Sequence, residues 1–183
     1  MKKNIVITGG LGYIGTELCK IYSGYSWNHQ ITVIDNRFVS ERVNQLRNWN
    51  INFVQGDILD KNLVLKYCEN ADIVHHLAGI TDVPRVKSES SDEQDKKIKV
   101  VAEIGTQNIL DAIQKNCKII MPSTHVVYEG IKEVKNDILE EEKTNPVLSY
   151  GTSKDINEKQ LKASGKNYII LRLGSVYGYS TDT

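Results

Sequence analysis

Tyr150 and Lys154 are the residues whose types and spacing best suit chemistry, and they stand four positions apart in the segment YGTSK. On a helix, this spacing puts both side chains on one face. An ammonium beside a phenol favours the phenolate, so the pairing predicts a lowered pKa for Tyr150. Such a phenol can take a proton from a hydroxyl while a hydride leaves the same carbon, which is the oxidation of an alcohol. Thr124 ends the segment MPST, directly after an expected strand, and could hold the reacting oxygen beside Tyr150.

A glycine-rich turn near the N-terminus offers a place for a hydride carrier. The segment TGGLGYIG, at residues 8–15, places Gly9, Gly12 and Gly15 between an expected strand and an expected helix. Glycines allow a sharp turn, a close approach of the backbone to a pyrophosphate, and close packing of the helix on the sheet. The helix N-terminus then presents N–H groups and the positive end of its dipole to the phosphates. Asp35 lies 20 residues after Gly15, where a ribose-binding carboxylate belongs, so the sequence predicts a dinucleotide site.

Asp35 also bears on which dinucleotide is bound. A carboxylate at this position accepts hydrogen bonds from the ribose hydroxyls and repels a 2′-phosphate, which favours NAD over NADP. Arg37 leaves NADP open, because a nearby arginine can accommodate that phosphate. Asp57, in the segment GDI after the third expected strand, is placed to approach the adenine, and a plain turn or helix cap is the alternative.

Short β-branched runs alternate with longer segments along the whole chain. Runs this apolar are typical of strands covered on both faces, as in a parallel sheet. The alternation of strand and helix favours an α/β fold with right-handed crossovers. The expected strands are residues 4–8, 30–35, 51–55, 72–77, 118–121 and 168–172, and the expected helices are residues 13–23, 40–48, 60–68, 92–115 and 149–164.

Composition narrows the class of protein. The 183 residues suit one globular domain, and 23 basic side chains balance 23 acidic ones, so no strongly cationic nucleic-acid surface is indicated. No apolar run approaches the ~20 residues of a membrane span. The three cysteines, Cys19, Cys68 and Cys117, are far apart, which predicts reduced thiols, a cytoplasmic compartment and no metal knuckle. His75 and His76 are neighbours on an expected strand and point to opposite faces, so we expect no shared metal, one buried ring and one ring near the cofactor cleft.

These motifs, in this order, resemble the N-terminal part of an extended short-chain dehydrogenase/reductase, of the NAD-dependent epimerase/dehydratase family that acts on nucleotide sugars. The resemblance implies that Tyr150 is the acid/base, that Lys154 is its activator and a ribose ligand, and that Thr124 is the third catalytic hydroxyl. It also implies that the backbone at residues 77–79 lines the cofactor. The matching stretches are residues 8–15, 35–36, 56–58, 76–79, 122–128, 150–154 and 171–178. The cofactor-binding residues expected within them are Gly9, Gly12, Tyr13, Ile14, Gly15, Asp35, Asn36, Asp57, Ile58, Leu77, Ala78, Gly79, Tyr150 and Lys154.

Three departures from the family pattern bear on the reaction. Dehydratases and decarboxylases of the family carry an acid one or two places after the catalytic threonine, where this chain has His125 and Val126, so elimination is disfavoured. Ala102 stands where the pattern has asparagine, three residues before the Gly-Thr of its helix, which puts one hydrogen bond of the site in question. Glu129 is inserted where the family has Val-Tyr-Gly.

The overall prediction is a doubly wound, parallel-sheet Rossmann domain over residues 1–183, with strand order 3-2-1-4-5-6. We expect an NAD-dependent nucleotide-sugar epimerase of the 4-epimerase type, acting through a transient 4-keto sugar. A ketoreductase or dehydrogenase of the same family, and a non-catalytic NAD-binding module, are the alternatives. Family members continue into a C-terminal substrate-binding region, which we expect to be missing beyond residue 183. The expected partner is a nucleotide sugar, with neither nucleic acid nor membrane. The apolar positions on the helix at residues 92–115 could form the interface of a homodimer, and packing within one chain explains them equally well.

Overall fold

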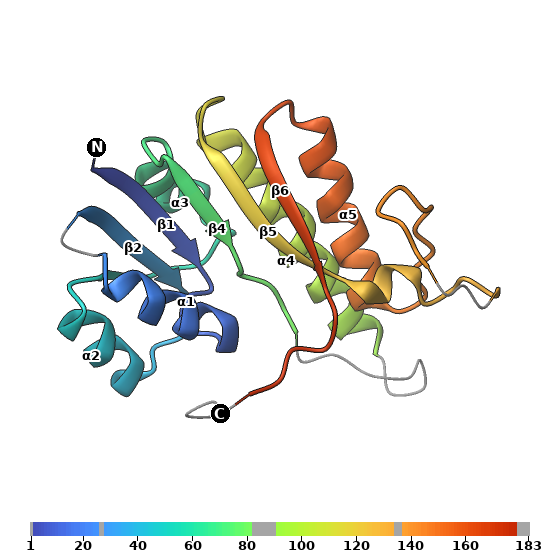
Figure 1. Ribbon diagram of the computed structural model, residues 1–183, viewed down its shortest axis with the longest axis horizontal. Coiled ribbons are helices and arrows are strands. Elements are labelled where there is room, and N and C mark those ends of the chain that lie inside the picture. The colour runs from blue at the N-terminus through green and yellow to red at the C-terminus, as the bar shows by residue number, and fades with distance from the viewer. Residues whose placement is uncertain (1, 26–27, 82–90, 134–136, 179–183) are drawn as a thin grey trace.

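The computed structural model describes residues 2–25, 28–81, 91–133 and 137–178. Six parallel strands form one sheet in the order β3-β2-β1-β4-β5-β6 (Figure 1), which confirms the predicted fold class and strand order. The order reverses between β1 and β4, and ligands of open α/β sheets bind at such a reversal, beyond the carboxyl ends of the strands. The strands are β1 (Lys3–Thr8), β2 (His29–Asp35), β3 (Asn52–Gln55), β4 (Ile73–His76), β5 (Lys118–Thr124) and β6 (Asn167–Leu173).

Strand β5 runs three residues further than expected, through Pro122 to Thr124. Proline lacks the N–H of a ladder hydrogen bond, which is why the sequence indicated an earlier end. Pro122 pairs in register with Leu171 of β6, and its carbonyl oxygen accepts a hydrogen bond from Lys154.

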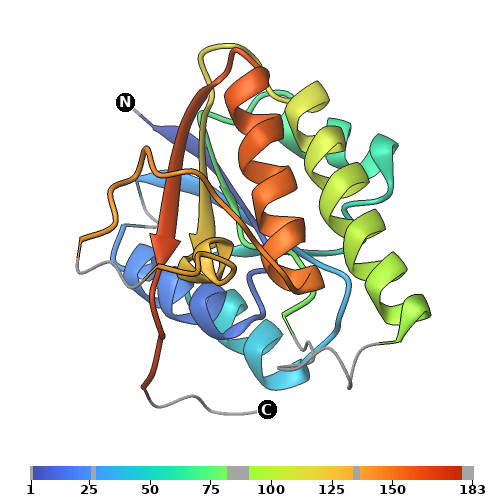
Figure 2. The same ribbon diagram turned by 90° about the vertical axis from the view of Figure 1, so that its right-hand side faces the viewer.

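Two layers of helices cover the sheet. Helices α1 and α2 lie on one face, and α3, α4 and α5 lie on the other (Figures 1 and 2). Between β5 and α5 the chain forms a short 3₁₀ helix, η2 (His125–Tyr128), which the sequence did not predict. The α-helices are α1 (Tyr13–Ser23), α2 (Ser40–Asn48), α3 (Lys61–Cys68), α4 (Asp92–Ala112) and α5 (Ser149–Ala163).

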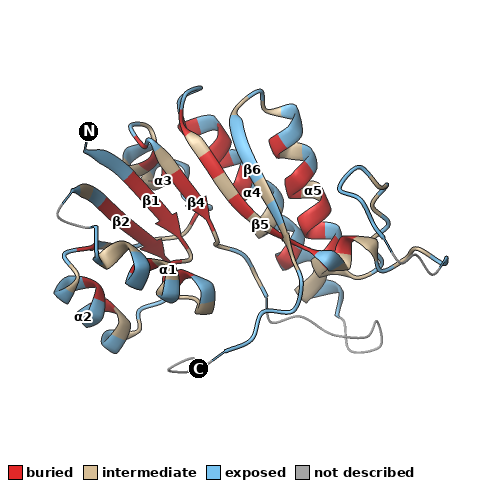
Figure 3. Cartoon of the chain, in the orientation of Figure 1, coloured by how far each residue is buried: buried red, intermediate tan, exposed pale blue. Residues whose placement is uncertain are grey.

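The central strands β1, β2 and β4 carry continuous runs of buried residues (Figure 3), and successive side chains of a strand point to opposite faces of the sheet. In β1, Ile5 and Ile7 pack toward α1 and α2, whereas Val6 packs toward α3, α4 and α5. Full burial of a side chain of this size stabilises the fold by about 1.5–3 kcal/mol. Each face of the central strands is therefore anchored, which holds the strand ends in fixed positions for the site.

The three cysteines are free and buried, as predicted. Cys19 lies in the core beside α1 and α2, and Cys68 and Cys117 lie in the opposite core. Burial raises the pKa of Cys19 and Cys68 to about 12 and that of Cys117 to about 11, so the thiols stay protonated and act as small apolar groups.

Candidate functional site

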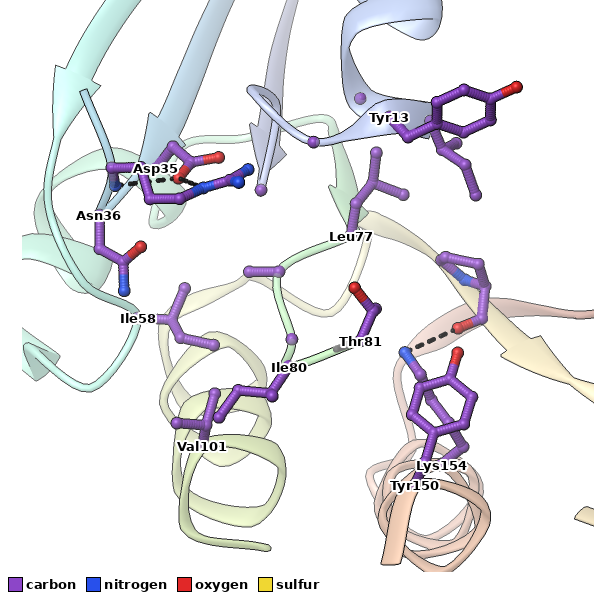
Figure 4. Close-up of a pocket in the computed structure, with 18 of the residues that line it drawn as sticks. Tyr13, Asp35, Asn36, Ile58, Leu77, Ile80, Thr81, Val101, Tyr150 and Lys154 are labelled. Atoms are coloured by element: carbon purple, nitrogen blue, oxygen red, sulfur yellow. Dashed lines mark hydrogen bonds and ion pairs between the residues drawn. The ribbon is translucent and has the colours of Figure 1, made fainter. Parts of the chain in front are cut away.

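A cleft of about 840 Å³ opens at the carboxyl ends of the strands. Figure 4 shows Asp35 and Asn36 at one end of it and Tyr150 and Lys154 at the other. The predicted site residues come from segments far apart in the sequence, and the structure brings all of them to this one cleft. They are Gly9, Gly12, Tyr13, Ile14, Gly15, Asp35, Asn36, Asp57, Ile58, Leu77, Ala78, Gly79, Thr124, Tyr150 and Lys154.

The turn between β1 and α1 is shaped by close packing. Gly9 has a φ of 70°, and a Cβ there would lie 2.6 Å from the backbone nitrogen of Ala78. A Cβ at Gly15 would lie 2.5 Å from the carbonyl oxygen of Gly9, so α1 packs against the turn itself. Gly12 is the N-cap of α1, which has neither a side-chain cap nor an acidic residue in its first turn. The helix N-terminus at the cleft therefore suits the pyrophosphate of a dinucleotide.

Asp35 is buried at the end of β2 and held from both sides. Its Oδ2 accepts from the backbone N–H of Leu11 at 3.0 Å, and its Oδ1 accepts from that of Arg37 at 3.0 Å. The Arg37 side chain reaches back, with its Nε 3.5 Å from the same Oδ1. The carboxylate is thus locked in one orientation with acceptor capacity left for ribose hydroxyls.

Asp57 was expected either to approach the adenine or to form a plain turn. In the structure it forms a turn with Leu59, and it also lines the cleft. Its Oδ1 accepts from the N–H of Leu59 at 2.9 Å, and its Oδ2 accepts from the side-chain amide of Asn36 at 3.1 Å. The N-cap of α3 is Asp60, whose Oδ1 accepts from the first turn of that helix. Asp57 therefore joins the ends of β2 and β3 at the Asp35 end of the cleft, and these residues together fit a dinucleotide such as NAD.

Lys154 is almost completely buried and faces the cleft from α5. Its Nζ donates to the carbonyl oxygen of Pro122 at 3.2 Å and lies 5.9 Å from the centre of the Tyr150 ring (Figure 4). Burial lowers the pKa of Lys154 to about 8. The ammonium is therefore charged at neutral pH and close to its titration point.

The predicted lowering of the Tyr150 pKa is wrong for the protein by itself. Burial raises the pKa of Tyr150 above its ordinary value, because the cleft removes the phenolate from water. Lys154 donates to a backbone carbonyl, and its own charge is disfavoured by burial. Spacing alone placed both residues on one face but carried no information about their desolvation.

Thr124 lines the cleft at the end of β5. Its Oγ1 accepts from the backbone N–H of Val126 at 3.2 Å, which caps η2. The hydroxyl hydrogen can therefore be donated to a substrate oxygen. Thr124 and Tyr150 line the same cleft.

A buried ion pair that the sequence analysis did not identify holds α5 against the sheet. Glu158, one turn after Lys154, accepts from Ser123 Oγ at 2.6 Å and from Arg172 Nη2 at 2.6 Å. Burial by itself raises the pKa of Glu158, but hydrogen bonds from Arg172 and Ser123 lower it overall. The signal available in the sequence was a charged residue on the inward face of a helix and an arginine within an apolar strand.

Both histidines of β4 are buried and hydrogen-bonded. Neither side chain lines the cleft, although His76 directly precedes Leu77 and Ala78, which do. His75 Nε2 lies 2.8 Å from the hydroxyl of Tyr22. His76 bridges two threonine hydroxyls, with Nδ1 2.9 Å from Thr8 Oγ1 and Nε2 2.9 Å from Thr106 Oγ1. Burial and, secondarily, the charge of Lys154 lower the pKa of His76 to about 3, so this ring is neutral.

The backbone carbonyl of Ala102 accepts a hydrogen bond from the neighbouring helix α5. Asn157 of α5 donates through its side-chain amide to the Ala102 carbonyl at 2.8 Å and to Thr106 Oγ1 at 2.9 Å. An amide from α5 thus reaches the part of α4 where the family pattern has asparagine. This bond fixes α5, and with it Tyr150, relative to α4.

The described residues offer neither a metal site nor a membrane span. Within those ranges no group of three or more histidine, cysteine or acidic side chains is arranged to hold a metal ion. In the same part of the chain no helix has the length and apolar character needed to cross a membrane.

Comparisons with known proteins bear on the identity of the cleft. UDP-glucose 4-epimerase of Mycoplasma genitalium is 30% identical over 190 residues, which cover 97% of this chain and 54% of that relative. UDP-N-acetyl-alpha-D-glucosaminuronate decarboxylase of Bacillus cytotoxicus is 33% identical over 130 residues, covering 70% of this chain and 38% of that relative. The chain thus spans about half the length of the curated relatives it matches.

Solved structures share the fold. UDP-glucose 4-epimerase from Brucella ovis, in complex with NAD, has a TM-score of 0.73 and 30% identity, covering 93% of this chain and 51% of that one. The enzyme WbmH of Bordetella bronchiseptica, in complex with NAD⁺, has a TM-score of 0.80 and 26% identity, covering 97% and 57%. Residues 5–183 match the sequence pattern of the NAD dependent epimerase/dehydratase family. Since that match includes the glycine turn, Asp35 and the Tyr150–Lys154 pair, the chain belongs to the NAD-dependent epimerase/dehydratase family.

Proposed function

We propose that the protein is an NAD-dependent nucleotide-sugar epimerase that inverts C4 through a transient 4-keto sugar. The observation that carries the proposal is that Thr124, Tyr150 and Lys154 line the same cleft as Asp35 and Asp57. Tyr150 and Lys154 lie at the end of this cleft that is away from Asp35 (Figure 4). Bound NAD supplies the acceptor that takes a hydride from C4 and gives it back, so the net reaction needs no outside oxidant.

Tyr150 moves the proton in both half-reactions. It accepts the proton of the C4 hydroxyl when that carbon is oxidised, and it returns the proton to the keto oxygen. Burial raises its pKa, so the phenol is the resting form and the return step is favourable. The positive charges of Lys154 and of the oxidised nicotinamide favour the phenolate that the forward step requires.

Lys154 and Thr124 hold the groups around Tyr150. No ion pair with Lys154 occurs among the described residues, so its positive charge acts on the phenol without a neutralising carboxylate. Thr124 donates its hydroxyl hydrogen to the substrate oxygen, beside the proton that Tyr150 carries. These roles follow the family resemblance and use only atoms that line the cleft.

Epimerisation is favoured over elimination or decarboxylation by the position of the acids. Among the described residues that line the cleft, the only carboxylates are Asp35 and Asp57, and both lie at the end away from Tyr150. His125, where an acid is expected for those reactions, is exposed, with its Nδ1 3.3 Å from the carbonyl oxygen of Leu173. Several relatives are UDP-glucose 4-epimerases, although a dehydratase and a decarboxylase also match.

The test uses the natural full-length protein with UDP-glucose deuterated at C4. An epimerase forms the C4 epimer with deuterium retained at C4 and no net change in NADH, whereas a dehydrogenase of the same family transfers the deuterium to NAD⁺ and accumulates reduced cofactor in proportion to the keto-sugar product. Tyr150→Phe should lower the rate by about 10²–10⁴-fold, because it removes the acid/base hydroxyl and keeps the aromatic ring. Turnover by the Phe variant at the rate of the natural protein would refute the assigned role of Tyr150.

The substrate partner and the assembly belong to the same proposal. Solved relatives have been crystallised with UDP-sugars, including UDP-glucuronic acid in the Bacillus cereus 4-epimerase. A homodimer packed through α4 is consistent with two exposed apolar residues of that helix, Val100 and Ile104. Analytical ultracentrifugation of the natural protein and of Ile104→Lys measures whether this face associates.

A further inference from the structure

Glu129, the residue inserted before Gly130, binds the chain directly ahead of the catalytic helix. Its Oε1 accepts from the backbone N–H of Val147 at 2.6 Å and from that of Leu148 at 2.5 Å. These two amides precede α5, which begins at Ser149. Hydrogen bonds from N–H groups to a carboxylate are charge-assisted and are stronger than those to a neutral acceptor.

Helix α5 has no N-terminal cap of its own. Its N-cap residue, Leu148, offers no side-chain hydrogen bond, and its first turn contains no acidic residue. The positive end of a helix dipole is stabilised by a nearby negative charge. Glu129 supplies a negative charge next to this helix start, and it binds the two backbone amides that directly precede the helix.

Further hydrogen bonds join the loop before α5 to η2 and to the residues that follow it. Asn145 donates from its backbone N–H to Val127 O at 2.8 Å and accepts from the N–H of Gly130 at 2.8 Å. Its side-chain amide donates to Gly130 O at 2.7 Å. A Cβ on Gly151 would lie 3.1 Å from the carbonyl oxygen of Val126, so the first turn of α5 lies directly against η2. Figure 2 shows this short helix beside the start of α5.

The two elements that Glu129 joins each carry a residue of the proposed reaction. Thr124 caps the start of η2 through the N–H of Val126, and Glu129 follows its end. Tyr150 lies two residues after Leu148, where Thr152 N–H donates to Leu148 O at 2.9 Å and starts the helical ladder. We propose that Glu129 is a positioning residue that fixes the first turn of α5, and so holds the Tyr150 phenol in register with the Thr124 hydroxyl.

The test compares Glu129→Ala and Glu129→Gln with Glu141→Ala, which removes an exposed glutamate of the same loop. In the natural full-length protein with NAD, hydrogen–deuterium exchange measures the amides of residues 147 and 148. We expect exchange about 10-fold faster in Glu129→Ala. Glu129→Gln should remain close to the natural protein, because the amide oxygen keeps the acceptor. NAD affinity should not change, since Glu129 does not line the cleft.

Two further readouts follow Tyr150 itself. Titration of ¹³Cζ-labelled tyrosine should show the pKa of Tyr150 moving toward its ordinary value in Glu129→Ala, because a loosened first turn admits water. The kinetic readout rests on the proposed function. The kcat for the epimerase should fall by about 10²-fold in Glu129→Ala, with KM little changed and with substantial recovery in Glu129→Gln, because small misplacements of reacting groups cost this much.

Unchanged exchange at residues 147 and 148 in Glu129→Ala overturns the inference, whatever the activity. Faster exchange with an unmoved Tyr150 titration and an unchanged kcat overturns the positioning role. An inactive natural protein in which Glu129→Ala still shifts the Tyr150 titration supports the positioning role and refutes the epimerase proposal, so the two failures are distinguishable.

Discussion

Replacing Lys154 by methionine should change the pH dependence of stability in a direction that the cleft dictates. Lys154 is buried, and its pKa in the folded protein is about 8, against an ordinary value of 10.5. Below pH 8 the lysine is charged in both the folded and unfolded states, so the folded state carries the full cost of the buried charge. That cost falls as the pH rises from 8 to 10.5 and disappears above 10.5, where both states are neutral.

The magnitude follows from the two pKa values. They differ by about 2.5 pH units, at 1.36 kcal/mol for each unit. The cost of the buried charge is therefore about 3 kcal/mol at pH 7 and about 1 kcal/mol at pH 10. The variant also loses the hydrogen bond to Pro122 O, but the effect of this loss on stability does not follow the titration of Lys154. His76, whose pKa is about 3, stays neutral over this range and does not contribute.

Urea unfolding of the natural protein and of Lys154→Met at pH 7, 8, 9 and 10 measures this difference. The stability of the variant relative to the natural protein should decrease by about 2 kcal/mol between pH 7 and pH 10. Lys99→Met, at an exposed lysine of α4, is the matched control and should show no such trend. A relative stability that is constant with pH would show that the Lys154 charge is not desolvated, and would refute the reasoning.

Further predictions concern the brace of α5 and the choice of cofactor. Glu158→Ala should lower the free energy of unfolding by about 3–5 kcal/mol, because it leaves the Arg172 guanidinium without its carboxylate; a loss below 1 kcal/mol in urea unfolding would contradict this. Asp35→Ala should weaken NAD binding by about 10–100-fold in calorimetric titration, because hydrogen bonds to the ribose hydroxyls are lost. An unchanged Kd would show that Asp35 does not bind the ribose. Arg37→Ala should weaken NADP binding more than NAD binding, whereas equal effects would show that Arg37 does not face the 2′ position.

Periodicity and turn residues located the elements of the fold well. The expected helices at residues 13–23 and 40–48 match α1 and α2 residue for residue, and the strand order is as predicted. Apolar runs of β-branched residues report burial on both sheet faces, which is a local property of the chain. The discrepancies lie at the ends of elements, because tertiary contacts set where an element stops. Strand β5 continues through Pro122 and pairs with β6, and α4 ends at Ala112 rather than at residue 115.

The proton-transfer properties of the site could not be predicted in the same way. The sequence placed Tyr150 and Lys154 on one helix face, but burial set the direction of the Tyr150 pKa against the expectation from charge. The functions of Glu158 and Asn157 were also not evident, because their partners Arg172, Thr106 and Ser123 come from other elements.

By itself, the sequence determined the α/β architecture and the glycine turn, and it supplied the candidates for the reacting side chains, since each depends on residue type and short-range spacing. Only the tertiary structure decided how these side chains are desolvated, that His75 and His76 are both structural, and that Glu129 reaches the start of α5. The physical reason is that desolvation and long-range hydrogen bonding depend on which elements meet in space. A local pattern shows which residues share a face, but it does not show what covers that face.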